Sequence, residues 1–185
     1  MDNNYIFQYW EAIQDGTVTV GKWIKPIYEI LVNGLKSGKW DFDEEKANKA
    51  INFIENFCHH SEGRNDLLKL ELWQKAIVSA IFGIMDKRTG YRQFREVFIV
   101  VARKNGKTLF AAAIAAYMAY IDGEYGAKVY FLAPKLDQAD LVYDAFYQIV
   151  QADDELDSIT KKRRSDIYIK EFNTSVKKIA FNSKK

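Results

Sequence analysis

The chain has 185 residues, of which 48% are hydrophobic, 28% charged and 15% aromatic, and this composition is typical of a folded domain with a packed core. The 27 basic and 25 acidic residues leave a formal charge of +2, so bulk charge gives no argument for nucleic-acid or membrane binding. A single cysteine, Cys58, excludes a disulfide framework and a cysteine-rich zinc site. The N-terminus lacks the features of a signal peptide, and the longest apolar run, residues 109–121, is shorter than the roughly 20 residues that span a bilayer. We therefore expect a cytosolic protein without membrane contact.

The first part of the chain predicts helices. Amphipathic patterns indicate helices over residues 5–14, 23–35 and about 70–85. Another helix should follow Asp41, which offers an N-cap with Glu44 three residues later, as in a capping box. We assign residues 1–90 to a helical entry region.

The second part predicts an α/β fold. Residues 97–101, Val-Phe-Ile-Val-Val, have the pattern of a strand buried on both faces, and the alanine-rich residues 109–116 predict a buried helix. Residues 128–133 predict a second strand, followed by a helix that Asp137 should cap. This alternation predicts a parallel sheet with right-handed crossovers over residues 91–185.

The end of the chain predicts two more strands. Residues 166–172 and 175–181 alternate between polar and apolar side chains on either side of Asn173 and Thr174.

The loop between the first predicted strand and the buried helix carries the clearest chemistry. It consists of Ala102, Arg103, Lys104, Asn105, Gly106, Lys107 and Thr108, and it ends in the Gly-Lys-Thr of a phosphate-binding loop. Gly106 allows backbone N–H groups to face an anion, Lys107 can reach the outer phosphates, and Thr108 can ligate Mg²⁺. Arg103 can also contact phosphate. The first glycine of the standard motif would fall at Val101, so the match is incomplete.

A second candidate element is the pair Trp73 and Gln74, in the helix that precedes the first predicted strand. A glutamine amide offers both a donor and an acceptor, which suits the edge of adenine. The alternative is a surface amide beside a core tryptophan. Together with the downstream loop, the spacing resembles the glutamine motif of helicase-like ATPases, and we expect both residues in a nucleotide-binding site.

A basic run, Lys161 to Arg164, has two interpretations that the sequence leaves open. These four side chains could contact DNA phosphate, or they could form a solvated loop.

Taken together, these motifs resemble the large subunit of the terminase of tailed bacteriophages and prophages. The segments that carry the resemblance are residues 60–63, 70–75, 81–83, 92–96, 102–108, 122–127 and 133–140. The phosphate loop of this family commonly has the form Arg-Lys-Asn-Gly-Lys-Thr/Ser without the first glycine, so Val101 agrees with the family pattern.

The resemblance implies a RecA-like ATPase domain of the additional-strand type, with ATP and Mg²⁺ as cofactors. Lys107 and Arg103 would then be catalytic, and Thr108 would be the metal ligand. In the whole protein this domain would be joined to a metal-dependent nuclease domain. Such a subunit drives double-stranded DNA into capsids in the host bacterial cytoplasm and cuts DNA concatemers. Its partners would be the small terminase subunit and the portal protein, on which it would form a homo-oligomer.

One departure from the family pattern concerns acidic residues. After Thr108 we find no apolar strand that ends in Asp-Glu, which such an ATPase needs for its metal, and no nuclease carboxylates. We therefore expect an N-terminal fragment that is inactive by itself.

Two alternatives remain. One is the RecA-like half of a helicase-type DNA translocase, which strand-separating helicase motifs would reveal. The other is a non-catalytic nucleotide-binding remnant, which would bind ATP without hydrolysis.

Overall fold

The computed structural model describes residues 4–60 and 63–181, and the chain divides into two compact units. Unit 1 comprises Met1–Asn52 and Leu70–Ile99, and unit 2 comprises Phe53–Lys69 and Val100–Lys185. Ser61 and Glu62, within the segment 60–63 noted above, lie outside the described residues. No helix in the described part of the chain combines the length and the apolar character that crossing a membrane requires.

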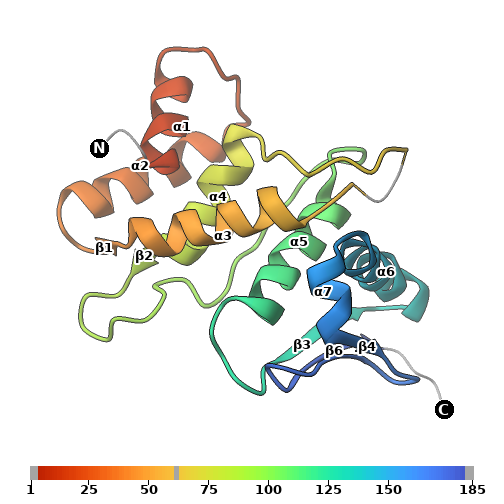
Figure 1. The fold of residues 1–185 in the computed structure, drawn as a ribbon. Coiled ribbons are helices and arrows are strands. Elements are labelled where there is room, and N and C mark those ends of the chain that lie inside the picture. The colour runs from red at the N-terminus through yellow and green to blue at the C-terminus, as the bar shows by residue number, and fades with distance from the viewer. Residues whose placement is uncertain (1–3, 61–62, 182–185) are drawn as a thin grey trace. The chain divides into compact units, whose positions relative to one another are not determined.

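Unit 1 consists mainly of helices (Figure 1). Its elements are α1 (Tyr5–Gln14), α2 (Ile24–Lys36), most of α3 (Glu44–Phe57), α4 (Leu72–Gly83), and the antiparallel strands β1 (Asp41–Phe42) and β2 (Ile84–Met85). The prediction of a helix over residues 5–14 is confirmed. Asn4 caps this helix because its side chain accepts the N–H of Ile6 at 2.9 Å.

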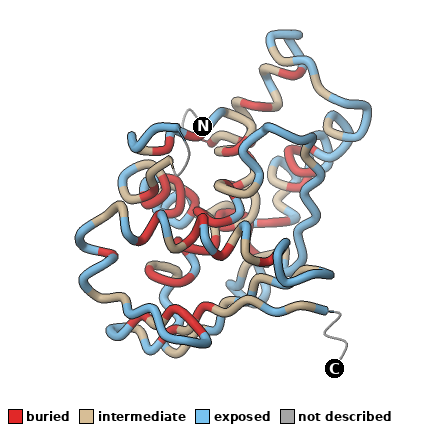
Figure 2. Tube along the Cα trace, turned by 90° about the vertical axis from the view of Figure 1, so that its right-hand side faces the viewer, coloured by how far each residue is buried: buried red, intermediate tan, exposed pale blue. Residues whose placement is uncertain are grey.

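The core of unit 1 is formed where α1, α2 and α4 face one another. Ile6 and Val32 are almost fully buried, and the rings of Tyr9 and Tyr28 meet edge to face with centroids 4.7 Å apart. In Figure 2, buried stretches lie in the helices and strands, whereas the connecting loops are mostly exposed.

The capping role predicted for Asp41 is wrong. Asp41 lies in β1, where it is paired with Met85, and helix α3 begins only at Glu44. The preceding Asp43 takes the cap position, because its carboxylate accepts the N–H of Lys46 at 3.0 Å. Pairing of Asp41 with a strand 44 residues away is not visible in the local pattern.

Unit 2 is a mixed α/β structure. Its helices are α5 (Lys107–Tyr120), α6 (Leu136–Ala152) and α7 (Asp154–Ile159), and its strands are β3 (Lys128–Ala133), β4 (Thr160–Lys162), β5 (Ile167–Ile169) and β6 (Thr174–Ala180). The strand order is β3-β6-β5-β4. The sheet is mixed: β3 and β6 are parallel, whereas β6 and β5, and β5 and β4, are antiparallel.

Several predictions for unit 2 can be compared with its elements. The strand over residues 128–133 is confirmed as β3. The strand predicted over residues 166–172 corresponds to the shorter β5, and the strand predicted over residues 175–181 corresponds to β6, which begins and ends one residue earlier. Asn173 turns between them with φ 52°. The cap predicted at Asp137 is wrong, because α6 begins at Leu136 and Asp137 lies in its first turn.

The buried strand predicted over residues 97–101 is also wrong. These residues belong to no strand of the described chain (Figure 1), and Phe98 and Val100 are 93% and 80% exposed. A run of β-branched and aromatic residues favours extended backbone, but a strand also needs a hydrogen-bonded neighbour. The extended segment lacks such a neighbour among the described residues.

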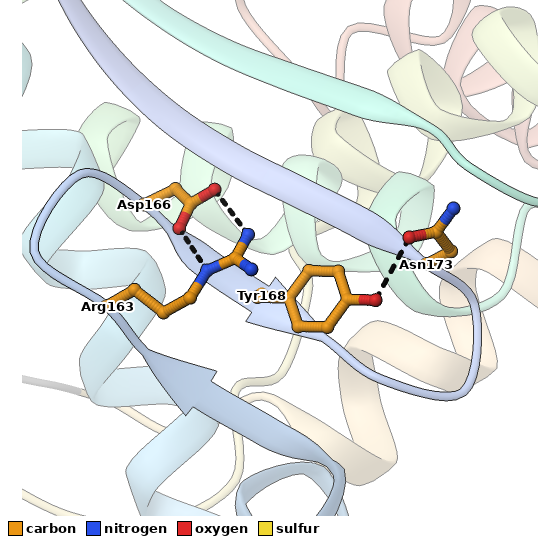
Figure 3. A network of polar contacts seen from close by, with 4 residues as sticks. All are labelled: Arg163, Asp166, Tyr168 and Asn173. Atoms are coloured by element: carbon orange, nitrogen blue, oxygen red, sulfur yellow. Dashed lines mark hydrogen bonds and ion pairs between the residues drawn. The ribbon is translucent and has the colours of Figure 1, made fainter.

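A polar network fixes the hairpin of β4 and β5 (Figure 3). Nε and a terminal nitrogen of Arg163 donate to the two carboxylate oxygens of Asp166 at 2.6 and 2.7 Å, and the guanidinium lies 4.1 Å from the ring centroid of Tyr168. The Tyr168 hydroxyl donates to the Asn173 side chain at 3.0 Å. The hydrogen bonds from Arg163 lower the pKa of Asp166, whose side chain is only 5% exposed.

The close approach of Gly34 to Trp40 in unit 1 gives a first prediction. A Cβ at position 34 would overlap the Trp40 ring, so Gly34→Ala should lower the free energy of unfolding by about 1–3 kcal/mol. Gly21→Ala is the matched control, because a Cβ there meets nothing within 4 Å and should change stability by less than about 0.5 kcal/mol. Urea denaturation followed by tryptophan fluorescence measures both. Equal stabilities of the two variants would contradict the overlap.

The Asp166 network gives a second prediction, on pH dependence. Because the folded pKa of Asp166 is lowered, its stabilising contribution is present above the unfolded pKa of about 3.9 and is lost as pH falls through the folded value. The wild type should therefore lose more stability below about pH 4 than Asp166→Asn, which carries no titrating carboxyl. Urea titrations followed by far-UV circular dichroism at neutral and acidic pH test this. Parallel pH profiles would show that the ion pair contributes nothing to stability.

Candidate functional site

The predicted phosphate loop, residues 102–108, is a tight turn that leads directly into α5. Gly106 is the N-cap of α5 with φ 65° and ψ 15°, and Lys104 also has a positive φ of 67°. Left-handed backbone is unfavourable for residues with a side chain, and glycine adopts it without this cost. A Cβ at Gly106 would meet no atom within 4 Å, so the backbone conformation, not packing, favours glycine here.

The side chain of Asn105 bonds back to the first residues of this turn. Its side-chain nitrogen donates to the carbonyl oxygens of Ala102 and Arg103 at 3.3 and 3.2 Å. These hydrogen bonds engage two backbone carbonyls of the loop. The loop therefore has an internal support that does not depend on a ligand.

The first turn of α5 supplies hydrogen-bond donors. The first helical bond runs from the N–H of Phe110 to the carbonyl of Gly106 at 2.9 Å. The N–H groups of Lys107, Thr108 and Leu109 precede this bond and have no helical acceptor, and the helix dipole places partial positive charge at the same end. An anion bound at this end of α5 would accept hydrogen bonds from these N–H groups and would be stabilised by the helix dipole.

The side chains of the loop are accessible and basic. Arg103, Lys104 and Lys107 are exposed, Thr108 is half-buried, and the seven residues include no carboxylate. The structure thus brings all seven predicted loop residues together at one helix end, with open space beside Gly106 for the approach of a phosphate.

Trp73 and Gln74 lie on α4, in unit 1, whereas the loop lies in unit 2. Trp73 packs partly buried against the core of unit 1. Gln74 is 8% exposed and completes a capping box at the start of α4: its side-chain oxygen accepts the N–H of Glu71 at 2.9 Å, and the Glu71 side chain accepts the N–H of Gln74. An amide oxygen has two lone pairs, so this bond leaves acceptor capacity for a ligand.

The sequence reasoning missed Glu71. A signal was available, because Glu71 and Gln74 have the spacing of a capping box immediately before an apolar helix. The structure shows a buried structural amide, where the sequence offered only an adenine contact or a surface amide.

Metal binding has one candidate ligand from the sequence, the hydroxyl of Thr108. Within residues 4–60 and 63–181, no group of three or more His, Cys, Asp and Glu side chains is arranged to hold a metal ion. Thr108 is the second residue of α5, in the turn whose N–H groups have no acceptor within the helix.

Comparison with known proteins gives the following. The sequence profile of the family described as "Terminase large subunit, ATPase domain" matches residues 72–184, more than half of the chain. The crystal structure of the HK97 bacteriophage large terminase is similar, with a TM-score of 0.65 and 24% sequence identity, which shows a common fold. The similarity covers 76% of this chain and 28% of that terminase, so the chain spans less than a third of the length of its structural relative. No curated protein matches the chain.

The capping box gives a third prediction. Gln74→Ala removes the acceptor for the Glu71 N–H and should lower the free energy of unfolding by about 0.5–2 kcal/mol, the usual effect of losing a cap. Gln74→Glu retains an acceptor at the same place and should preserve more of the stability. Denaturation followed by tryptophan fluorescence measures both variants. If Gln74→Ala is as stable as the wild type, the bond has no structural value.

Proposed function

Because the chain belongs to the family of terminase large subunit ATPase domains, we propose that it binds Mg²⁺-ATP and forms part of a motor that packages double-stranded DNA. The observation that carries the proposal is the loop of residues 102–108, which lies inside the segment matched by the family. Its left-handed Gly106 at the start of α5 and its basic side chains support binding of a triphosphate.

Each loop residue has a role that follows from its chemistry. The N–H groups of Lys107, Thr108 and Leu109 would donate to phosphate oxygens, and the left-handed Gly106 allows these groups to face the ligand. The ammonium group of Lys107 would neutralise charge on the outer phosphates. The exposed guanidinium of Arg103 would donate to phosphate oxygens as negative charge shifts during transfer.

Thr108 would supply a hydroxyl ligand to Mg²⁺, in keeping with the preference of this ion for oxygen donors. Bound Mg²⁺ would neutralise the charge that develops on the transferred phosphate. The basic side chains of the loop repel a free metal ion, but they attract a Mg²⁺-triphosphate complex because its net charge is negative.

Gln74 would recognise the adenine base. The capping bond to Glu71 fixes the amide, and a fixed amide loses less conformational entropy when it binds a base edge. Trp73 would support this helix turn through its contact with the core of unit 1.

The arrangement of the whole protein is part of the same proposal. Residues 1–90 would form the helical entry region and residues 91–185 the beginning of the ATPase core, with a metal-dependent nuclease elsewhere in a longer protein. This protein would act in the host bacterial cytoplasm as a homo-oligomer on the portal protein, together with the small terminase subunit. A helicase-type translocase has a similar loop and glutamine, but the family match favours packaging.

The proposal gives a fourth prediction. Lys107→Ala removes a charged donor to phosphate and should weaken ATP binding by about 1.5–3 kcal/mol, without loss of the fold because Lys107 is exposed. Lys170→Ala is the control, since Lys170 is an exposed lysine of the same unit outside the loop. Isothermal titration with Mg²⁺-ATP measures the affinities, and circular dichroism verifies folding. Equal affinities of wild type and Lys107→Ala would refute the phosphate-loop assignment.

A further inference from the structure

The sheet of unit 2 has two chemically different faces. Helix α6 covers one of them: the ring of Phe131 in β3 meets Tyr143 and Phe146, with centroids 6.3 and 6.0 Å apart. On this same face Lys178 of β6 pairs with Asp140 of α6.

Lys162 in β4 also points to the α6 face. Its ammonium group lies 4.0 Å from the ring centroid of Tyr147, a residue of α6. Because successive side chains of a strand point to opposite faces, Lys161 must lie on the other face of the sheet.

The register of the four strands places a row of donors on this other face. Lys161 of β4 is paired with Tyr168 of β5, Tyr168 with Ser175 of β6, and Ser175 with Lys128 of β3. The row thus crosses the whole sheet, with a lysine at each edge and two hydroxyl groups between them. Neighbouring strands lie about 4.8 Å apart, so the row extends over roughly 14 Å.

A second row lies beside the first. Lys177 follows Ser175 by two residues in β6 and therefore points to the same face. Arg163 and Asp166 lie just outside β4 and β5, but the Arg163 guanidinium contacts both the Tyr168 ring and the Asp166 carboxylate, so these two side chains lie beside Tyr168. Figure 3 shows the side chains of Arg163, Asp166 and Tyr168 on one side of the hairpin. We refer to Lys128, Lys161, Arg163, Asp166, Tyr168, Ser175 and Lys177 as the basic face.

The charges of the basic face do not cancel. Asp166 is its only carboxylate, and the bidentate hydrogen bonds of Arg163 engage both of its oxygens. Lys177 also lies close enough to contribute to the lowered pKa of Asp166. The two lysines at the edges, Lys128 and Lys161, are exposed. The four cations and one carboxylate leave a net charge of +3.

Other carboxylates lie at the margins. Glu124 and Glu171 are in the turns that precede β3 and follow β5, and Lys170 lies next to Glu171. Asp154 and Glu155 are at the N-terminal end of α7, whereas its C-terminal end joins β4. These acids lie outside the strands of the sheet. Within the strands, the exposed apolar side chains of Tyr130, Leu132 and Ile179 continue the same face.

We propose that the basic face binds the sugar-phosphate backbone of duplex DNA. Lysine, tyrosine and serine side chains are donors of the kinds that contact DNA phosphates, and a line of donors over roughly 14 Å suits a repeating polyanion better than a single anion. Charge complementarity therefore favours DNA as the occupant. The inference rests on the proposed function in one respect, that DNA is the substrate of the motor.

The test compares two pairs of neighbouring lysines in β4 and β6 that point to opposite faces of the sheet. Lys161→Ala/Lys177→Ala removes one lysine from β4 and one from β6 on the basic face, and Lys162→Ala/Lys178→Ala removes their sequence neighbours on the α6 face. Binding of a short fluorescein-labelled DNA duplex to the 185-residue chain is measured by fluorescence anisotropy over a series of KCl concentrations.

The first pair should bind the duplex about tenfold more weakly, and the slope of log affinity against log salt should fall by about 2, one for each lost phosphate contact. The second pair should bind within about twofold of the wild type, because Lys162 and Lys178 are engaged by Tyr147 and Asp140. Lys128→Ala provides an independent variant at the opposite edge of the sheet and should lower the slope by about 1.

Equal weakening by the two pairs would mean that only bulk charge matters, and the proposal would be overturned. It would also be overturned if the unchanged chain does not bind the duplex, or if Lys128→Ala and the first pair bind like the wild type. Isothermal titration with Mg²⁺-ATP on the same proteins separates this result from the proposed function. ATP binding that is retained by the first pair and weakened by Lys107→Ala supports the nucleotide site whatever the DNA result.

Discussion

The phosphate loop can present its donors only if the helix behind it is fixed, and the packing of α5 provides this constraint. Ala112, Ala113 and Ala116 are fully buried, and their small side chains allow α6 to approach closely. A series of rings then connects the end of α3 to the sheet, with centroid distances of 6.5 Å for Phe53 and Tyr120, 6.4 Å for Tyr120 and Phe146, and 6.0 Å for Phe146 and Phe131. Because these contacts fix the body of α5, its first turn has a defined direction, and the left-handed Gly106 can redirect the chain there.

Elements that depend on neighbouring residues in the sequence could be predicted, whereas elements that depend on contacts with distant residues could not. Helix α1 and strand β3 have the predicted bounds, because their side-chain periodicity and flanking residues suffice. The strand expected over residues 97–101 failed because a strand is defined by its neighbours, and side-chain preference alone does not supply them. The cap predicted at Asp41 was wrong because this residue pairs with a distant strand, β2, and so cannot act as the N-cap of α3.

The candidate site shows the same division. The loop was recognisable because the residues that give it chemistry, Gly106 to Thr108, are adjacent in the sequence. The hydrogen bonds of the Asn105 side chain and the positive φ of Lys104 could not be recognised from the sequence, because they depend on the path of the backbone after Val101. Gln74 was assigned to a ligand or to solvent, and its hydrogen bond to Glu71 shows that a site residue can also be a structural one. The capping role of Gln74 is compatible with base binding, because the capping hydrogen bond fixes the orientation of the amide that would bind the base.

The basic run shows why charge counted along a sequence differs from charge presented to a ligand. A strand sends Lys161 and Lys162 to opposite faces of the sheet, and the turn then engages Arg163 with Asp166. The run therefore cannot act as one cluster of four charges. Its contribution to the basic face is completed by Lys128 and Lys177, which are far away in the sequence and are brought alongside by strand register. A shift of one residue in that register would move all these lysines to the side of α6, where burial of their charge would be costly. The apolar residues that fix the register, Ile167 and Val176 beneath α6, thus also determine where the positive charge lies.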